Sequence, residues 1–362
     1  FEAIQGVHLF GIRATTYVTE RVLANAPDLL AIGAFCIGTN QIDLAATNAH
    51  GVAVFNAPYS NTRSVVELAI AEIISLARRL HEKSTAMHDG VWNKSAAGSH
   101  EVRGRTLGIV GYGNIGSQLS VIAEALGLSV IFYDIDDKLA LGNARKCATL
   151  EELLADADVV SLHVDGRPGN AGLFGDHQMR AMKPRALFMN LSRGIAVDTE
   201  ALSRHLKSGH IAGAALDVFP VEPKAQGDPF ESDLRGIPNV ILTPHVGGST
   251  EEAQQDIGRF VASKLRAYAK AGTTSLSVTF PELALPSDPE RHRLAHVHAN
   301  APGVLARINT ILGDHGVNIE GQQLATKGEL GYVVTDISAE VGTEVLNELA
   351  ALPETVRLRQ LS

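Results

Sequence analysis

Short apolar runs rich in β-branched residues alternate with longer amphipathic stretches along most of the chain. Up to about Asn93 the runs VHLF, DLLAIGA and VAVF predict strands, followed by a long helix from about Ser64 to Asp89. After Gly104 six more runs predict strands: TLGIVG, SVIFYD, DVVSLHV, ALFMNLS, AGAALDVF and NVILTPH. Strands that alternate with helices are typical of βαβ units, so we expect an α/β fold built on parallel sheets.

The last part of the chain has a different order of elements. From Arg293 onward the pattern predicts strand, helix, strand, strand, helix and strand, which is the ferredoxin-like order. The preceding segment 287–291 is rich in proline and charge, as linkers are. A helix over 251–271 follows the second set of strands, and we expect it to return to the first domain. We therefore predict three domains: a flavodoxin-like domain from residues 1–60 and 248–285, a Rossmann-type doubly wound domain inserted at 61–247, and a ferredoxin-like domain at 291–362.

Length, composition and charge narrow the class of protein. A chain of 362 residues can bury two or three cores, and 45% hydrophobic with 20% charged residues is typical of a soluble globular enzyme. A formal net charge of -9 provides no basic field for nucleic acid or for an anionic membrane surface. The most apolar helix candidate, residues 65–80, is interrupted by Glu67 and Glu72, which excludes a membrane span.

The two cysteines and the first residue add two further expectations. Cys36 and Cys147 provide neither a disulfide framework nor metal-ligand spacing, so we expect a cytoplasmic protein without a bound metal. The chain begins with Phe1 and shows no signal-peptide pattern, so we expect it to start inside the first domain, with one or two earlier strands missing.

A glycine-rich loop predicts that the second set of strands binds a nucleotide. Gly111, Gly113 and Gly116 follow the strand TLGIV and precede a helix expected from about 117 to 126. Glycine permits a tight turn and a close approach of pyrophosphate to the helix N-terminus. Asp134 ends the next strand, where a carboxylate can bind both ribose hydroxyls and would repel a 2′-phosphate. The alternative is a turn that merely needs glycine, but the flanking strand, helix and acid favour an NAD site.

Three ionisable residues follow predicted strands farther along the chain: Arg193 in NLSRG, Glu222 in DVFPVEP and His245 in LTPHVGGST. Oxidation of an alcohol beside a carboxylate needs a base, and the imidazole of His245 titrates near neutrality. Glu222 can fix the tautomer of that imidazole and favour its protonated form. Arg193 can bind a substrate carboxylate with two parallel N–H bonds.

Each of these three residues also has a structural alternative. Arg193 could cap a strand end, Glu222 could lie in an exposed turn, and His245 could be a satisfied histidine. Because ligands of open α/β folds gather at the carboxyl ends of strands, the three residues together favour the active site of a 2-hydroxyacid dehydrogenase.

Segments along essentially the whole chain resemble the D-isomer-specific 2-hydroxyacid dehydrogenases. They are FCIGTNQIDL, FNAPYSNTRSVVELAIAE, GVWNKSAAGS, GIVGYGNIGSQL, NLSRG, DVFPVEP, LTPHVGGST and PGVLARIN. The resemblance implies oxidation of 3-phosphoglycerate to 3-phosphohydroxypyruvate by NAD, the first step of serine biosynthesis, and similar enzymes also reduce 2-oxoglutarate. It implies His245 as acid-base, Glu222 as its partner and Arg193 on the substrate. The implied cofactor contacts are Asn114 and Ile115 at the pyrophosphate, Asp134 at the adenosine ribose, and Leu191, Ser192, Arg193 and Asp217 on the nicotinamide side.

The resemblance also places the second anion of the substrate near Arg13, Asn61 and Lys94. The alternative is that Arg13 and Lys94 are simply solvated. The chain departs from its relatives in the segment GIRATT, where Thr15 stands in place of a second basic residue.

The last domain resembles an ACT domain, a small regulatory fold that binds amino acids between chains. The resemblance implies that His298, Asn300 and Asn318 hold serine as a feedback inhibitor, and that the protein is a homo-oligomer, a tetramer. A helix after Pro302 offers free N–H groups to a carboxylate, and asparagine amides can bond both ends of an amino acid. The alternative is that Asn300 is a helix N-cap and Asn318 a turn residue.

Two other functions stay open from the sequence. One is a reductase of glyoxylate, hydroxypyruvate or D-lactate without a preference for phosphate. The other is an NAD-sensing binding protein, since corepressors share this fold; the appended amino-acid-binding domain argues against it.

Overall fold

The computed structural model describes residues 4–223, 225, 227–284 and 292–361, so the predicted linker at 287–291 lies outside the described residues. The chain divides into two compact units, one formed by Phe1–Ser60 with Gln254–Ser362 and the other by Asn61–Ala253. Among the described residues, no helix is both long and apolar enough to cross a membrane.

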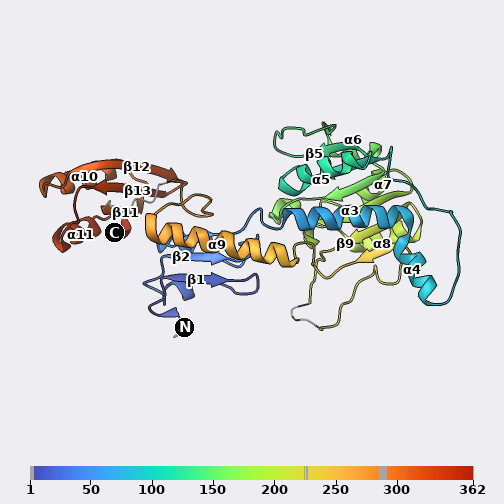
Figure 1. Ribbon diagram of the computed structural model, residues 1–362, viewed down its shortest axis with the longest axis horizontal. Helices are drawn as coiled ribbons and strands as arrows, with labels where there is room; N and C mark the ends of the chain where they lie inside the picture. The colour runs from blue at the N-terminus through green and yellow to red at the C-terminus, as the bar shows by residue number, and fades with distance from the viewer. Residues whose placement is uncertain (1–3, 224, 226, 285–291, 362) are drawn as a thin grey trace. The chain divides into compact units, whose positions relative to one another are not determined.

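A seven-stranded parallel sheet forms the centre of the unit Asn61–Ala253 (Figure 1). Its strands are β4 (Thr106–Val110), β5 (Ser129–Tyr133), β6 (Arg145–Lys146), β7 (Val159–Leu162), β8 (Ala186–Asn190), β9 (Ile211–Leu216) and β10 (Val240–Leu242). They lie in the order β10-β9-β8-β7-β4-β5-β6, and every neighbouring pair is parallel. The order reverses direction between β4 and β7, as in a doubly wound Rossmann-type fold. This confirms the predicted fold, although β6 is too short and polar to be predicted.

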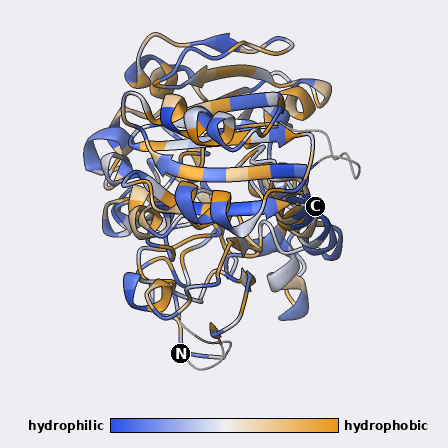
Figure 2. Ribbon diagram, turned by 90° about the vertical axis from the view of Figure 1, so that its left-hand side faces the viewer, coloured by the Kyte–Doolittle hydropathy of each residue, from blue (hydrophilic) through white to orange (hydrophobic). Residues whose placement is uncertain are grey.

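Helices cover both faces of this sheet. They are α3 (Thr62–Arg78), α5 (Asn114–Ala125), α6 (Leu150–Asp156), α7 (Asp176–Ala181) and α8 (Thr199–Lys207), with 3-10 turns at η2 (Pro168–Asn170) and η3 (Gly194–Ala196). The helix α4 (Leu80–His88) follows α3 and has no buried residue. The helices α3 and α5 share one buried cluster with the sheet, and α6, α7 and α8 share another. Because both faces are covered, the strands are nearly continuous apolar runs. Along the chain as a whole, hydrophobic and hydrophilic residues alternate within helices and strands (Figure 2), as in elements with one buried face.

The long helix predicted from Ser64 to Asp89 is wrong, because the chain breaks it at Arg79. This residue adopts a left-handed conformation, φ 54°, between α3 and α4. A non-glycine residue in this region costs about 1–2 kcal/mol. The Arg79 guanidinium donates to Glu82 from Nε at 2.9 Å and from Nη2 at 2.5 Å, which offsets part of that cost. No glycine or proline lies at the break, so the helical pattern of apolar residues continues through Arg79 and predicts one long helix.

The unit Phe1–Ser60 with Gln254–Ser362 contains a smaller parallel sheet. Its strands are β1 (Leu9–Ile12), β2 (Ala31–Ala34) and β3 (Ala53–Phe55), in that order, joined through α1 (Glu20–Leu23) and α2 (Leu44–Ala49). The helix α9 (Glu251–Ala271) packs Val261 and Leu265 against this sheet. A side chain at Gly33 in β2 would lie 2.6 Å from Val261, so glycine permits the close approach of α9.

The end of the same unit has the predicted ferredoxin-like order. It comprises β11 (His292–Ala299), α10 (Val304–Asp314), β12 (Ile319–Lys327), β13 (Leu330–Ile337), α11 (Thr343–Ala350) and β14 (Thr355–Leu361). The strands form an antiparallel sheet in the order β12-β13-β11-β14. The two helices cover one face. The other face packs Val297 and Tyr332 against Tyr268 and Phe280, and Tyr332 donates to the Gly272 carbonyl at 2.6 Å.

Candidate active site

The glycine-rich loop after β4 has the shape that a dinucleotide requires. Gly111 has φ +92°, and a side chain there would lie 2.5 Å from the carbonyl oxygen of His163. A side chain at Gly116 would lie 2.3 Å from the Gly111 carbonyl oxygen. Around Gly113, by contrast, no atom lies within 4 Å of an added Cβ, so this side of the loop is open. The first and third glycines therefore close the turn, and the second leaves room for a ligand.

The helix α5 begins at Asn114, three residues earlier than predicted. Its backbone ladder starts with the N–H of Ser117, which donates to the Gly113 carbonyl at 2.9 Å. The N–H groups of Asn114 and Ile115 precede that bond and carry the positive end of the helix dipole. Such a terminus can bind pyrophosphate.

Asp134 is held at the end of β5 by two backbone donors. One of its carboxylate oxygens accepts from the Tyr112 N–H at 2.7 Å and the other from the Asp136 N–H at 2.9 Å. Each carboxylate oxygen has a further lone pair for a ribose hydroxyl. The residues of the loop and of β5 thus fit NAD.

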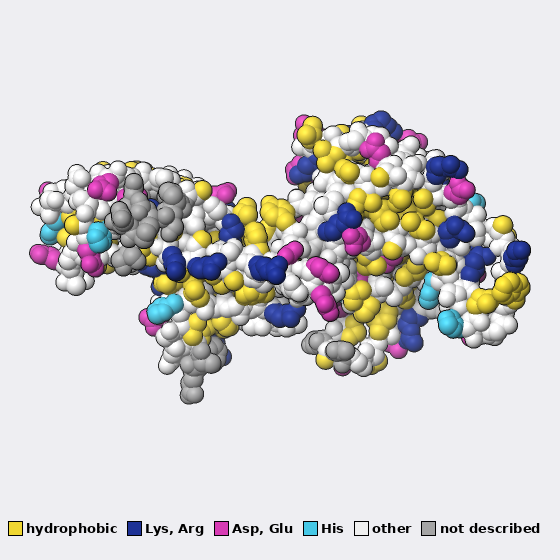
Figure 3. All heavy atoms as spheres, in the orientation of Figure 1, with side chains coloured by type: hydrophobic (Ala, Val, Ile, Leu, Met, Phe, Trp, Pro, Cys, Tyr) yellow, Lys and Arg dark blue, Asp and Glu magenta, His cyan; other side chains and the backbone are white. Residues whose placement is uncertain are grey.

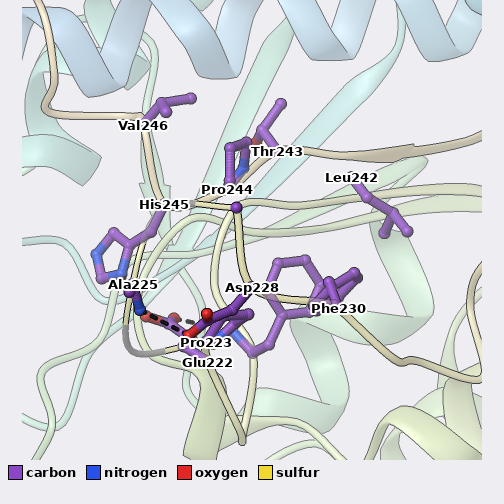
Figure 4. Close-up of a pocket in the computed structure, with 12 residues that line it drawn as sticks. Glu222, Pro223, Ala225, Asp228, Phe230, Leu242, Thr243, Pro244, His245 and Val246 are labelled. Atoms are coloured by element: carbon purple, nitrogen blue, oxygen red, sulfur yellow. Dashed lines mark hydrogen bonds and ion pairs between the residues drawn. The ribbon is translucent and has the colours of Figure 1, made fainter.

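His245 and Glu222 form a hydrogen-bonded pair (Figure 4). The Nδ1 atom of His245 lies 2.9 Å from Oε2 of Glu222, and the Phe219 N–H donates to Oε1 of Glu222 at 3.1 Å. An ionised Glu222 requires the proton on Nδ1, which leaves the lone pair of Nε2 free to accept a proton. The side chain of His245 is 53% exposed, so that nitrogen is accessible.

The surroundings of this pair favour opposite charges on its two members. The hydrogen bond to Glu222 raises the pKa of His245 and outweighs the burial that lowers it. Burial works against ionisation of Glu222, but the hydrogen bonds from His245 and the Phe219 N–H outweigh it, so the pKa of Glu222 lies below its ordinary value. The pair therefore favours a protonated His245 beside an ionised Glu222.

Asp217 fixes the loop that carries His245. Its carboxylate accepts from Oγ1 of Thr243 at 2.6 Å, from the Val246 N–H at 2.8 Å and from the Gly247 N–H at 2.7 Å. The side chain is 2% exposed, so its visible role is to hold this loop. His245 itself has φ 55°, a strained conformation that such anchoring maintains.

Arg193 lies in the neighbouring loop. A side chain at Gly194 would lie 1.9 Å from the Phe219 carbonyl oxygen, so glycine lets the NLSRG loop touch the segment that leads to Glu222. The Nη1 atom of Arg193 donates to the Ser192 carbonyl at 2.7 Å, and the guanidinium has further N–H groups that can bind a carboxylate. Arg193 also acts electrostatically on both Glu222 and His245.

Leu191 and Ser192 hold this loop from inside. Leu191 is buried, and the hydroxyl of Ser192 bonds Oδ1 of Asn190 at 2.8 Å. The structure thus brings together, within one unit, the three catalytic candidates and the candidates on the nicotinamide side.

A cavity of about 640 Å³ lies beside the His245–Glu222 pair. Phe219, Phe230, Leu242 and Pro244 make its lining largely apolar, and the described lining residues include neither lysine nor arginine. The lining that the structure describes is therefore better suited to an apolar group than to an anion.

The three candidates for the second anion do not meet within one unit. Arg13 belongs to the unit Phe1–Ser60, where its Nη2 donates to Gln254 at 3.0 Å. Asn61 precedes α3 beside Gly248, with a buried Oδ1 that has no partner among the described residues. Lys94 is exposed in the segment after α4. The structure of either unit alone does not assemble them.

The three candidates for serine lie at opposite ends of the ACT sheet. His298 and Asn300 are at the carboxyl end of β11, where Ala299 pairs with Leu330. Asn318 directly precedes β12, whose first residue Ile319 pairs with Ile337. The two ends of β13 are about 24 Å apart at ~3.4 Å per residue. One chain therefore cannot bring all three side chains to a ligand as small as serine.

Two titratable groups near the site, the half-buried His163 and the buried Glu72, have no sequence signal. His163 follows β7, contacts the hydroxyl of Ser161 at 2.8 Å, and burial lowers its pKa to about 4. Glu72 is buried in α3, where the pattern predicts only a core helix. Burial depends on neighbours distant in sequence, so a motif could not have found them.

Comparison with known proteins supports these observations. Residues 70–247 match the family model of the D-isomer specific 2-hydroxyacid dehydrogenase NAD binding domain, and residues 294–357 match the AHAS small subunit-like ACT domain. The chain is 50% identical to D-3-phosphoglycerate dehydrogenase of Haemophilus influenzae over 99% of this chain and 88% of that relative. It is 47% identical, with the same coverage, to D-3-phosphoglycerate dehydrogenase of Dictyostelium discoideum.

A solved structure shows the same arrangement of elements. The NAD-complexed D-isomer specific 2-hydroxyacid dehydrogenase of Lactobacillus delbrueckii subspecies bulgaricus superposes with a TM-score of 0.69 at 28% identity, over 76% of this chain and 88% of that one. The chain therefore belongs to the D-3-phosphoglycerate dehydrogenases, within the NAD-dependent D-isomer-specific 2-hydroxyacid dehydrogenase family.

Proposed function

We propose that this protein oxidises 3-phosphoglycerate to 3-phosphohydroxypyruvate with NAD, as the first step of serine biosynthesis, and that serine inhibits it. The observation that carries the proposal is the hydrogen-bonded His245–Glu222 pair beside Arg193, in the same unit as a loop that fits NAD. The relatives at about half identity bear the name of this activity.

The proposed chemistry follows from the geometry of the pair. Nε2 of His245 takes the hydroxyl proton of the substrate while the adjacent C–H bond breaks. Glu222 stabilises the resulting imidazolium through Nδ1. Arg193 binds the substrate carboxylate and polarises the oxygen that becomes a carbonyl. Bound NAD supplies the hydride acceptor, held at Gly113, Asn114, Ile115 and Asp134.

The second anion of the substrate distinguishes the two candidate enzymes. The described residues that line the cavity beside His245 include no lysine or arginine. We assign the second anion to Arg13, Asn61 and Lys94, as the resemblance implies, with Phe1–Ser60 as part of the substrate-binding domain. Relatives carry a second basic residue where this chain has Thr15, so Arg13 and Lys94 are the two cations that we assign to this anion. The alternative is a reductase of glyoxylate, hydroxypyruvate or D-lactate, and 2-oxoglutarate is a further candidate substrate.

The proposed function also includes assembly into a homo-oligomer and a location in the cytoplasm. The separation of Asn318 from Asn300 supports a serine site formed by two copies of the chain. Apolar side chains gather on the surface of the unit Asn61–Ala253 (Figure 3), and Val91 and Trp92 are 54% and 78% exposed there. Exposed apolar groups of this kind are typical of a subunit interface. Both cysteines are free, as in cytoplasmic proteins.

One assay tests the proposal. NADH oxidation is measured with 3-phosphohydroxypyruvate, 2-oxoglutarate and glyoxylate, each with and without serine. We expect the phosphorylated substrate to give the highest kcat/KM and serine to lower the rate. A higher kcat/KM for glyoxylate would select the alternative enzyme, and rates unaffected by serine would remove the regulatory part.

A further inference from the structure

One carboxylate in the NAD-binding unit is buried without a hydrogen-bond partner. Glu72 is 3% exposed, and neither of its carboxylate oxygens has a partner among the described residues. A charged carboxylate in such a place loses its hydration without compensation, so the neutral acid is favoured.

The face of α3 that carries Glu72 packs against the loop that carries His245. A side chain at Gly247 would lie 3.7 Å from Leu68, which is one turn before Glu72 on the same face. One turn after Glu72, the carbonyl of Leu76 accepts from Nδ2 of Asn239 at 3.4 Å, directly before β10. Glu72 therefore lies between two contacts that α3 makes with the segments around β10.

Asp217 is the charged group that acts on Glu72. Burial raises the pKa of Glu72 to about 8, and the negative charge of Asp217 contributes to this shift. Asp217 has three donors from the loop 243–247, whereas Glu72 has none among the described residues. Two buried carboxylates near each other do not both ionise readily, so the proton stays on Glu72.

No cation among the described residues contributes to the pKa shift of Glu72, which arises from burial and from Asp217. Strands β8, β9 and β10 contain no charged residue, and His245 follows β10 with Glu222 as its partner. The charged groups on the neighbouring helices are engaged elsewhere. Glu124 in α5 accepts from the Asn143 N–H, Glu82 in α4 accepts from Arg79, and Glu67 in α3 accepts from Arg63. Of the cations, Lys83 in α4 donates to the Ser95 carbonyl at 2.6 Å and Arg78 at the end of α3 is exposed.

We propose that Glu72 is a positioning residue for His245: it is protonated in the active enzyme, and its ionisation adds a second negative charge behind Asp217 and displaces the loop 243–247. This inference rests on the proposed function, because it acts through proton transfer at His245. In the direction of alcohol oxidation His245 must be unprotonated, so His245 sets the acid limb of the pH profile. Glu72 sets the alkaline limb.

The test is the pH profile of kcat/KM for 3-phosphoglycerate oxidation between pH 6 and 10 in the full-length protein. Glu72→Gln is compared with wild type, and Glu67→Gln provides the same substitution at an exposed position of the same helix. We expect an alkaline limb near pH 8 in wild type and in Glu67→Gln. In Glu72→Gln this limb moves upward by one pH unit or more, since the amide cannot ionise. Glu72→Leu replaces it if the glutamine variant does not fold. An alkaline limb that coincides in all variants would overturn the proposal.

A second measurement separates this inference from the proposed function. If wild type does not oxidise 3-phosphoglycerate at any pH, the proposed function fails, and Glu72 is tested by melting temperature. Folded wild type holds a proton on Glu72 that the unfolded chain releases above its ordinary pKa, so wild type alone loses stability as pH rises toward 8. The melting temperature of Glu72→Gln minus that of wild type should therefore increase from pH 5 to pH 8. A difference that is independent of pH would also overturn the proposal.

Discussion

At the scale of single residues, the reactivity of His245 depends on what each of its two ring nitrogens contacts. Nδ1 is engaged by Glu222, and the exposed side chain leaves Nε2 for the substrate. The left-handed backbone at His245 and the three hydrogen bonds to Asp217 determine where that nitrogen lies. Without Glu222 and Asp217, the proton of His245 would not be fixed on Nδ1 and Nε2 would not be held in this position.

Replacing Glu222 should change both rate and pH dependence. The hydrogen bond to Glu222 raises the pKa of His245, and alcohol oxidation requires the neutral imidazole. In Glu222→Gln the pKa of His245 should fall toward about 6.5, so the acid limb of kcat/KM moves to lower pH. The maximal rate should fall about 10²-fold, because the imidazolium loses its counter-charge. An acid limb that stays in place would mean that Glu222 does not act on the titrating group.

His245 can be removed as an independent check. His245→Ala should lower kcat by about 10²–10⁴-fold, the usual contribution of a general base. NAD titration by intrinsic fluorescence should change little, because the dinucleotide loop lies in a different segment. Turnover like that of wild type would exclude His245 from the chemistry.

Asp134 should determine the choice of cofactor. Its carboxylate is held by two backbone N–H groups and keeps further lone pairs that can accept hydrogen bonds from ribose hydroxyls. Asp134→Ala should weaken NAD binding by about 10- to 100-fold, equivalent to a charged hydrogen bond of about 1.5–3 kcal/mol. The preference for NAD over NADP should narrow, as measured by the ratio of kcat/KM values. An unchanged ratio would mean that the carboxylate does not reach the ribose.

At the scale of elements, the active site is made by loops that follow parallel strands and press against one another. The NLSRG loop follows β8, the DVFPVEP loop follows β9 and the LTPHVGGST loop follows β10. These strands are neighbours in the order β10-β9-β8, so the three loops leave the same edge of the sheet. Contact between the first two loops depends on Gly194.

Adding one methyl group at Gly194 should separate these loops. The new Cβ would meet the Phe219 carbonyl, so Gly194→Ala should shift the backbone and cost about 1–3 kcal/mol of stability. We expect kcat/KM to fall by at least about 10²-fold, as for a small misplacement of catalytic groups. Gly169→Ala is the matched control, because an added Cβ there has no atom within 4 Å. Stability is measured by urea unfolding and activity by kcat/KM for both variants. Equal kcat/KM values for Gly194→Ala and Gly169→Ala would show that the loop contact is dispensable.

At the scale of the whole molecule, the proposed regulation requires more than one chain. His298 and Asn300 lie at one end of the ACT sheet and Asn318 at the other. A site that combines them must take Asn300 from one copy and Asn318 from another. Two such sites then form in each pair of copies.

Mixed oligomers can test this arrangement. Asn300→Ala and Asn318→Ala should each abolish inhibition by serine while leaving the uninhibited rate nearly unchanged. When both variants are co-expressed with different tags, a hybrid pair contains one site with both asparagines and one with neither. Purified hybrids should therefore regain serine binding at up to half of the sites, measured by calorimetry. Hybrids that bind no serine would show that the three residues do not form a site between copies.

The local pattern of the chain was enough to predict the parallel α/β sheet, the ferredoxin-like end and the glycine loop. These features depend on the period of apolar positions and on residues close in sequence, as in the run from TLGIV to Asp134. The candidates Arg193, Glu222 and His245 could be selected because each follows a predicted strand. The spacing of these three residues in the sequence does not show that their side chains lie close together in the folded chain.

Tertiary structure decided the rest, because it depends on neighbours that are far apart in the chain. Arg79 breaks a helix where no glycine or proline marks an end, and its conformation is supported by the contacts with Glu82. Gly194 matters only because the Phe219 carbonyl lies against it, and Glu72 is unusual only because folding leaves it without a partner among the described residues. Burial and close contact are properties of the folded chain, and they give these ordinary residues their roles.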